Sequence, residues 1–381
     1  MPPRCRILGA TAHLRHRQKP RMTDANSTTL RVGLIGYGFA GKTFHAPLIQ
    51  ATTELSLNAV ASCDAAKVHR DLPDVEVFAE AAQLIASADI DLVIIASPNA
   101  THASLASAAL RAGKHVVVDK PFTLDLAEAR PLLTQAEQAG RLLSVFHNRR
   151  WDSDFLAVKQ AIKCGVVGTV RHFESHFDRY RPAVRARWRE QAIPGGGVWY
   201  DLGPHLIDQA LQLFGLPQRV SATLAIQRPR GVVEDWAHVL LDYGSAQVIL
   251  HASMLVAGGG VRFIVHGDRG SLLKAGADRQ ESQLLAGMTP GAPGWGEDPD
   301  PLIVFEGEKS AQPIGVPAGD YRRYYAGIRD AIGGSAANPV PPIQALAVMA
   351  VLQAAITSNR AGRASSLPLT PAECAAWQQH A

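Results

Sequence analysis

The chain has 381 residues, of which 47% are hydrophobic and 19% are charged. That length accommodates two ordinary domains, and that composition is typical of globular proteins with a large buried core. No stretch approaches the roughly 18 consecutive apolar residues of a transmembrane helix, so we expect no membrane partner. The four cysteines are scattered without a C-x-x-C pair, which favours reduced thiols in a cytoplasmic protein over disulfides or a zinc cluster.

The formal net charge of +4 arises at the start of the chain. Residues 1–21 hold six Arg or Lys and no acid, so the remaining residues carry a net charge of −2. We therefore expect no nucleic-acid partner. The segment lacks the apolar run of a secretory signal. Its Arg-rich composition resembles that of a transit peptide. Alternatively, Met22 is the natural initiator methionine, since it opens the polar segment that precedes the first strand. Under either interpretation, residues 1–28 are expected to be disordered or dispensable.

Residues 29–149 are predicted to form a dinucleotide-binding domain of the α/β class. Short apolar runs typical of buried parallel strands alternate with helical segments. The expected strands are 30–35, 57–61, 91–96, 115–118 and 142–146. The expected helices are one after the first strand and those at 78–88, 101–112 and 125–139. This alternation predicts a doubly wound parallel (Rossmann) sheet.

The pattern changes after residue 149, and residues 150–381 are predicted to form a second, α+β domain. Strand-like runs follow one another there without intervening helices, which indicates an open, mainly antiparallel sheet. The expected strands are 170–177, 219–228, 236–242, 246–254 and 261–266; the expected helices are 153–163, 320–333 and 342–359, with a long loop at 287–301. We expect this domain to bind substrate and, through an uncovered sheet face, to form a homodimer or homotetramer.

A glycine-rich turn follows the first strand. Gly36, Tyr37, Gly38, Phe39, Ala40 and Gly41 match G-x-G-x-x-G between a strand and a helix. The first glycine permits the tight turn, the second lets a pyrophosphate approach the backbone, and the third allows close helix packing. At the head of alternating strands and helices, this motif predicts that the chain binds NAD or NADP.

The choice between NAD and NADP depends on the end of the second strand, where an acid would bind the ribose 2′-hydroxyl and repel a 2′-phosphate. Ser62 stands at the usual position of that acid, followed by Cys63, Asp64 and Lys67. A serine beside a cation tolerates phosphate, whereas an inward-facing Asp64 favours NAD. The sequence leaves both cofactors open.

Three further segments carry residues suited to chemistry. Ser97, Pro98, Asn99 and His102 follow the third expected strand, and Asp119, Lys120 and Pro121 follow the fourth, at the sheet edge where such folds bind ligands. The glycine-rich stretch 195–197 precedes Asp201 and His205. An imidazole suits the proton transfer that accompanies hydride transfer. If 201–209 is helical, Asp201 and His205 share one face and the carboxylate can orient the imidazole. Lys120 can donate to the reacting oxygen.

These segments resemble the Gfo/Idh/MocA oxidoreductase family. Asp119-Lys120-Pro121 corresponds to the family's E-K-P, with the shorter Asp in place of Glu, and Asp201 and His205 correspond to its D-x-x-x-H. The resemblance covers about residues 30–360 and implies that Lys120, Asp201 and His205 are the catalytic residues. Strings at 36–49, 145–155 and 173–182 are similar to bacterial scyllo-inositol 2-dehydrogenases.

Other residues are weaker candidates. His147, Asn148, Arg149, His176 and Tyr200 are candidates for substrate binding, as are Tyr180, Arg181 and Arg185. His172, Glu174 and His176 share one strand face. Two histidines and a glutamate suggest a metal, but we favour a polar sheet face and predict no metal site.

The function expected from these residues and from the resemblance is reversible oxidation of a secondary hydroxyl on a cyclic polyol or sugar, with scyllo-inositol the first candidate. Two alternatives share the fold: an NAD-dependent glycoside hydrolase, and a non-catalytic dinucleotide-binding regulator. The complete set of Lys120, Asp201 and His205 argues against the regulator.

Overall fold

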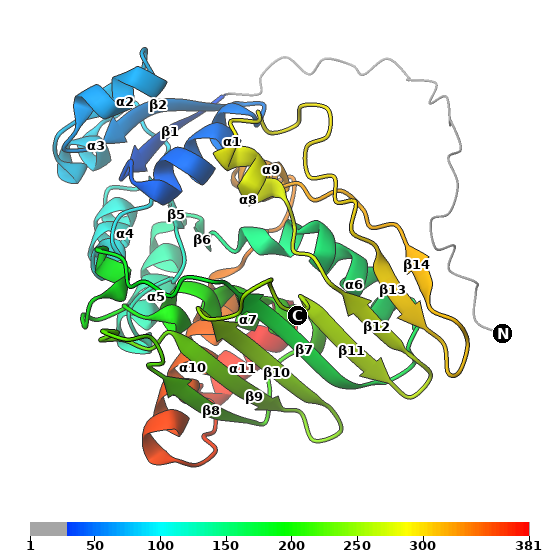
Figure 1. The fold of residues 1–381 in the computed structure, drawn as a ribbon. Helices are drawn as coiled ribbons and strands as arrows, with labels where there is room; N and C mark the ends of the chain where they lie inside the picture. The colour runs from blue at the N-terminus through cyan, green and yellow to red at the C-terminus, as the bar shows by residue number, and fades with distance from the viewer. Residues whose placement is uncertain (1–28, 381) are drawn as a thin grey trace.

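The computed structural model describes residues 29–380. The predicted extension at 1–28 lies outside the described residues. The described chain is organised around two β-sheets, one in each half of the sequence (Figure 1).

The first sheet, sheet A, is six-stranded and entirely parallel, in the order β3-β2-β1-β4-β5-β6. Its strands are β1 (Leu30–Ile35), β2 (Leu55–Ala61), β3 (Glu76–Phe78), β4 (Leu92–Ile95), β5 (His115–Val118) and β6 (Leu143–Val145). This is the order of a Rossmann fold, which confirms the predicted class. The central strands are almost fully buried, as expected where helices cover both faces.

The helices of this half connect successive strands. They are η1 (Gly41–His45), α1 (Ala46–Gln50), α2 (Ala65–Asp71), α3 (Ala81–Ala86), η2 (Asn99–Thr101), α4 (His102–Arg111) and α5 (Leu126–Ala139). The carboxyl ends of all the parallel strands lie at one edge of sheet A. The loops that follow these strands therefore gather at that edge, where such folds bind ligands.

The second sheet, sheet B, is eight-stranded and mixed, in the order β14-β13-β12-β11-β7-β10-β9-β8. Its strands are β7 (Val170–Asp178), β8 (Arg219–Ala225), β9 (Trp236–Asp242), β10 (Gln247–Ser253), β11 (Phe263–Gly267), β12 (Ser271–Lys274), β13 (Leu302–Phe305) and β14 (Gln312–Ile314). Every pair is antiparallel except β7 with β10, which run parallel at its centre. The predicted open, mainly antiparallel sheet is confirmed.

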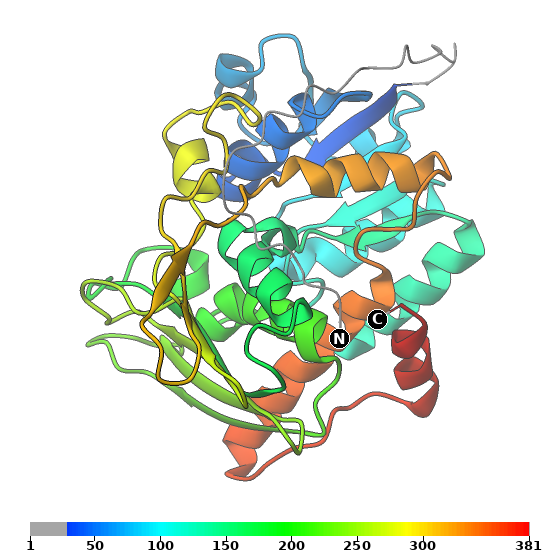
Figure 2. The same cartoon turned by 90° about the vertical axis from the view of Figure 1, so that its right-hand side faces the viewer.

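Helices pack on one face of sheet B (Figure 2). The helices of this half are η3 (Asn148–Trp151), α6 (Ser153–Lys163), η4 (Trp188–Glu190), α7 (Val198–Phe214), α8 (Gln280–Leu285), α9 (Arg322–Ile332), α10 (Pro342–Ala361) and α11 (Pro371–His380). α7 contacts the central strands β7, β9 and β10, while α10 contacts α7 and β8. Along β7, Phe173, Ser175 and Phe177 face these helices, and the alternate residues face outward.

By length and composition alone, α10 could cross a membrane, but 72% of its most apolar 18-residue window is buried inside the protein. It is therefore a core helix between sheet B and α5.

Some predicted elements differ from those observed. The expected helix 78–88 is wrong at its start, because residues 76–78 form edge strand β3 beside β2 and the helix spans only 81–86. Helices α2, α8 and α11 and strands β12, β13 and β14 were not predicted. The three strands have three or four residues each, and α2 and α8 have seven and six, which is too short for a clear periodic pattern. Helix α11 buries only Trp377, so it has no apolar stripe.

Candidate active site

Two cavities lie on either side of the glycine-rich turn that follows β1. The first, of about 430 Å³, is lined by Phe39 and Ala40 of the turn, by Lys120 after β5, and by Asp201 and His205 of α7. The second, of about 640 Å³, is lined by Gly36, Tyr37 and Gly38 and by the end of β2. The turn therefore separates two adjoining spaces, the arrangement that an extended dinucleotide requires.

The backbone of the turn depends on its glycines. Gly36 has φ of +96°, and a Cβ there would lie 2.7 Å from the carbonyl oxygen of Ala96. A Cβ on Gly38, in contrast, would meet nothing within 4 Å. The first glycine thus permits β1 and β4 to approach at their carboxyl ends, and the second leaves open the space beside the backbone where a phosphate would lie.

The second cavity contains the predicted ribose-binding residues. Ser62, Cys63, Asp64 and Lys67 all line it, together with Ser97. The Asp64 carboxylate caps α2 by accepting a hydrogen bond from the Lys67 backbone N–H at 2.9 Å, so it is occupied within its own helix. The Lys67 ammonium donates to the Tyr37 carbonyl oxygen at 2.9 Å.

In the first cavity, Lys120 joins the two halves of the chain. Its ammonium donates to the backbone oxygen of Asp201 at 2.6 Å and to the Asp201 carboxylate at 3.1 Å. The peptide bond between Lys120 and Pro121 is cis. Burial alone would raise the pKa of Asp201, but the positive charges of Lys120, Arg189 and Arg179 overcome it and hold that pKa far below its usual range. Asp201 is therefore a permanent anion that fixes the lysine.

His205 lies one helical turn after Asp201 and lines the same cavity. Burial, followed by the charges of Lys120 and Arg149, lowers its pKa well below 6.5, so the imidazole is neutral at physiological pH. Its Nδ1 is buried and has no hydrogen-bond partner among the described residues. The Asp201 carboxylate pairs with Lys120 and Arg189, so the orienting contact between Asp201 and His205 that the helical spacing suggests is replaced by these ion pairs.

Asp119, immediately before the lysine, also lines the first cavity. Burial would raise its pKa, but the neighbouring His45 imidazole and the Lys120 ammonium hold it at about 2. His45 is fully buried on η1, where its Nδ1 lies 2.6 Å from the Tyr325 hydroxyl. Asp119 therefore links the helix that follows the glycine-rich turn to Lys120.

A segment between β7 and α7 forms the remaining wall of the cavity and is rich in arginine. The cavity-lining arginines of this segment are Arg179, Arg181, Arg185, Arg187 and Arg189. Burial and the neighbouring Arg179, Arg185 and Arg187 lower the pKa of Arg181 to about 10. Such a concentration of like charge favours oxygen-rich or anionic ligands.

Asn148 and Arg149, which follow β6, line the first cavity as well. The Arg149 guanidinium donates to Glu281 of α8 at 2.6 Å and lies over the ring of Phe177, 4.9 Å from its centroid. His147, just before them, is buried without a hydrogen-bond partner among the described residues, and burial lowers its pKa to about 4.

Other predicted site residues lie outside the lining of both cavities in the described chain. Asn99 donates to the Gly195 carbonyl oxygen at 3.2 Å. His102 is buried between the carbonyl oxygens of Pro121 and Ser97, at 2.8 and 3.0 Å, so it connects the loops that follow β4 and β5. Tyr200 donates to the Leu124 carbonyl oxygen at 2.9 Å.

His176 lies on the outward face of sheet B, because the strand alternates and Phe177 is the residue that faces α7. Four charged residues that the sequence did not single out line the first cavity: Arg179, Arg187, Arg189 and Glu281. The spacing of the arginines was an available signal, since alternate residues in extended backbone face the same side. Glu281 gave no local signal, because a long-range contact brings α8 to the site.

A Rossmann sheet, a glycine turn that lines two cavities, and a Lys–Asp–His group in the first cavity define a NAD(P)-binding oxidoreductase. The chain belongs to the Gfo/Idh/MocA family: residues 30–147 match the family's NAD-binding Rossmann fold, and residues 159–369 match its C-terminal alpha/beta domain.

Individual relatives cover nearly the whole fold. The chain is 52% identical to the uncharacterized oxidoreductase YdgJ of Escherichia coli over 88% of this chain and 97% of the relative. It is 38% identical to the scyllo-inositol 2-dehydrogenase (NADP(+)) IolW of Bacillus subtilis, over 88% and 95% of the two chains. A crystal structure from Klebsiella pneumoniae is similar with a TM-score of 0.88 and 57% identity, covering 93% of this chain and 99% of that one.

Proposed function

We propose that this chain is an NAD(P)-dependent dehydrogenase acting on a secondary hydroxyl, or the corresponding ketone, of a cyclic polyol or sugar. Scyllo-inositol is the first candidate substrate, in line with the activity of the Bacillus relative. The observation that carries this proposal is the convergence of Lys120, Asp201 and His205 on one cavity beside the glycine-rich turn.

Each of the three side chains has a role that follows from its surroundings. His205 is a neutral imidazole, so it can take the hydroxyl proton as the carbonyl forms and return it in the reverse direction. The Lys120 ammonium donates a hydrogen bond to the reacting oxygen, where negative charge develops. Asp201 holds the lysine through the 3.1 Å ion pair; it is a positioning residue.

Residues of the turn and the loops after β2, β4 and β5 would hold the dinucleotide. When bound, the nicotinamide supplies or accepts the hydride. We propose that NADP is preferred, because Ser62 occupies the end of β2 and the Asp64 carboxylate caps α2. Ser62→Asp should move the ratio of kcat/KM values toward NAD by about tenfold through repulsion of the 2′-phosphate; an unchanged ratio contradicts this preference.

The first test is the absorbance of the reduced nicotinamide with purified protein, with NAD and NADP tried separately against inositols and aldoses. Turnover that is lost in both Lys120→Ala and His205→Ala supports the proposal. Release of aglycone from nitrophenyl glycosides without net reduction of added cofactor would instead indicate the glycoside hydrolase. Tight cofactor binding with neither activity would indicate the regulator.

A second candidate, oxidation of an acidic sugar, is favoured by the five arginines on one wall of the cavity. No salt bridge joins Arg179, Arg181 or Arg185 to an acid within residues 29–380. A carboxylate or phosphate on the substrate would meet this unpaired charge. A uronate or inositol phosphate with kcat/KM well above that of scyllo-inositol, and with that advantage lost in Arg181→Gln, would support the acidic substrate.

We further propose a cytoplasmic homo-oligomer, a dimer or tetramer, that uses the outward face of sheet B. Ile249, Ile264, Leu273 and Ile303 on that face are only partly covered within one chain. Light scattering of the purified chain measures the oligomer directly, and a monomer at micromolar concentration contradicts this proposal.

A further inference from the structure

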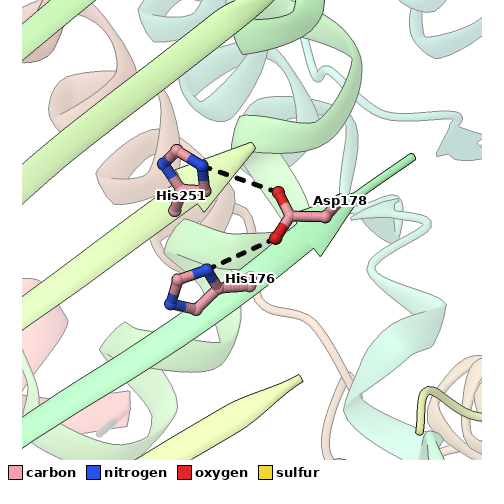
Figure 3. Close-up of side chains that lie close together, drawn as sticks. All are labelled: His176, Asp178 and His251. Carbon is pink, nitrogen blue, oxygen red and sulfur yellow. Dashed lines mark ion pairs between the residues drawn. The ribbon is translucent and has the colours of Figure 1, made fainter. Parts of the chain in front are cut away.

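A cluster of two histidines and one aspartate lies on the outward face of sheet B. β7 and β10 run parallel there, with His176 directly opposite His251 and Asp178 opposite Ser253. Because side chains alternate along a strand, His176 and Asp178 share this face with His251. Figure 3 shows both imidazoles beside the Asp178 carboxylate, on two neighbouring strands.

The distances within this cluster suit a small cation. Asp178 Oδ2 lies 3.5 Å from His176 Nδ1, and Asp178 Oδ1 lies 3.6 Å from His251 Nε2. One ligand atom from each of the three residues can be chosen so that all lie within 4.8 Å of one another. Around a tetrahedral Zn²⁺ with bonds of 2.0–2.2 Å, neighbouring ligand atoms are roughly 3.3–3.5 Å apart. Small side-chain rotations therefore bring the three into ligand positions.

The hydrogen bonds around His176 also favour a cation next to its Nδ1. Its Nε2 lies 2.8 Å from a Glu174 carboxylate oxygen, so this nitrogen carries the proton. The other ring nitrogen, Nδ1, then faces the Asp178 carboxylate at 3.5 Å, a contact that either a proton or a metal cation on Nδ1 would stabilise. A carboxylate on the far nitrogen is also the arrangement found around metal-ligating histidines, where it orients the ring and raises its basicity.

Asp178 supplies an independent observation. Its side chain is only 6% exposed, yet Oδ1 has no hydrogen-bond partner among the described residues. A buried carboxylate oxygen left unsatisfied is costly, and a bound cation would satisfy it. This aspartate is aimed into the space between the two imidazoles (Figure 3).

We propose that His176 Nδ1, an Asp178 carboxylate oxygen and His251 Nε2 bind a divalent transition metal of the Zn²⁺ type. Two imidazoles and one carboxylate favour Zn²⁺, Co²⁺ or Ni²⁺ over Mg²⁺ or Ca²⁺, which prefer oxygen ligands. Three protein ligands leave a fourth position for water or another ligand. The site uses Asp178 and His251 in addition to His176, whereas the strand pattern alone pointed to His172 and Glu174.

The metal site is separate from the catalytic cavity but adjoins it through the backbone. Phe177 faces His205 from the opposite side of the strand, with ring centroids 6.2 Å apart. Arg179, the residue after Asp178, lines the catalytic cavity. A bound metal would cross-link the carboxyl ends of β7 and β10, next to the start of the arginine-rich wall.

The test is titration of chelator-treated, full-length protein with Co²⁺, followed by its visible absorption bands. We expect one equivalent to bind with imidazole and carboxylate ligation, and Zn²⁺ to displace it. Asp178→Asn and His251→Gln should each weaken Co²⁺ binding at least tenfold, whereas His266→Gln, on the same face but bonded to Ser271, should not.

Absence of Co²⁺ binding at 100 μM would overturn the proposal, and so would equal binding by the wild type and both variants. If either variant fails to fold, cobalt-soaked crystals of the wild type decide the matter. An anomalous-scattering peak between the three side chains supports the site, and stoichiometric cobalt bound elsewhere overturns it.

Discussion

The two faces of β7 place histidines in opposite electrostatic surroundings. On the inner side, His205 is buried beside Lys120 and Arg149, whose charges lower its pKa together with burial. On the outer side, His176 lies between the carboxylates of Glu174 and Asp178. The inner histidine is held neutral and free to accept a proton, whereas the outer one is surrounded by groups that attract a cation.

Neighbouring charged groups, rather than the residue type, therefore decide what each histidine can do. The proposed base, His205, has cations as its charged neighbours, whereas the proposed metal ligand, His176, lies between carboxylates. Four predictions separate these two environments.

Replacing the inner histidine should have the largest effect. His205→Asn removes the proposed proton acceptor and should lower kcat/KM by about 10²–10⁴-fold, measured by nicotinamide absorbance with the polyol or sugar that the substrate panel identifies. His266→Gln, on the outer face, should keep wild-type kinetics. Activity of His205→Asn within threefold of wild type would contradict the role of the inner histidine.

Acid should destabilise the protein through its inner histidines. Burial lowers the pKa of His147 from 6.5 to about 4, so between these values the unfolded chain binds a proton that the folded chain does not. The stabilisation is complete above pH 6.5 and is lost as the pH falls toward 4, by up to about 1.4 kcal/mol per pH unit. His205 contributes with the same sign.

Urea unfolding at a series of pH values measures this slope. His147→Gln should reduce the slope between pH 6.5 and 4, even if it also lowers the free energy of unfolding at every pH. An identical slope in wild type and variant would show that His147 does not titrate in this way.

Replacing the outer carboxylate behind His176 should have a smaller effect. Glu174→Gln keeps a hydrogen-bond acceptor for Nε2 but removes the charge, so Co²⁺ affinity should fall by about tenfold, the low end for outer-shell partners. The optical titration measures this change. A loss as great as that of Asp178→Asn would make Glu174 a direct ligand, and no loss would exclude its orienting role.

The smallest expected effect concerns Lys120, the charged group beside His205. Lys120 is the largest charge that lowers the pKa of His205, so Lys120→Met should raise that pKa, measured by NMR titration of the imidazole. Lys163→Met, on an exposed part of α6, is the matched control. An unchanged or lower pKa in Lys120→Met would contradict the electrostatic account.

Much of sheet A was predictable, because its signals are local. The strands at 30–35 and 115–118 were predicted with the observed bounds, since a parallel strand buried on both faces is a continuous apolar run. The short strands β12, β13 and β14 were not predicted. Each is stabilised by pairing with a neighbour in sheet B, and pairing leaves little trace in the strand's own sequence.

The candidate site likewise has a part that local motifs predict and a part that depends on contacts between distant residues. The turn at 36–41 and Asp119-Lys120 could be located because each is a contiguous motif after a strand. The partner of Asp201 could not be predicted in this way. Helical spacing favoured His205, but the Asp201 carboxylate instead accepts a hydrogen bond from Lys120, 81 positions earlier. Likewise Glu281 reaches Arg149 across 132 positions.

Local sequence was therefore sufficient to predict the Rossmann class, the dinucleotide turn and the catalytic candidates, because backbone conformation and strand burial depend on nearby residues. Only the tertiary structure decided which charges surround each histidine. Charges act through space over a few ångströms, and the residues that supply them come together only when β5, β7, β10 and α7 pack.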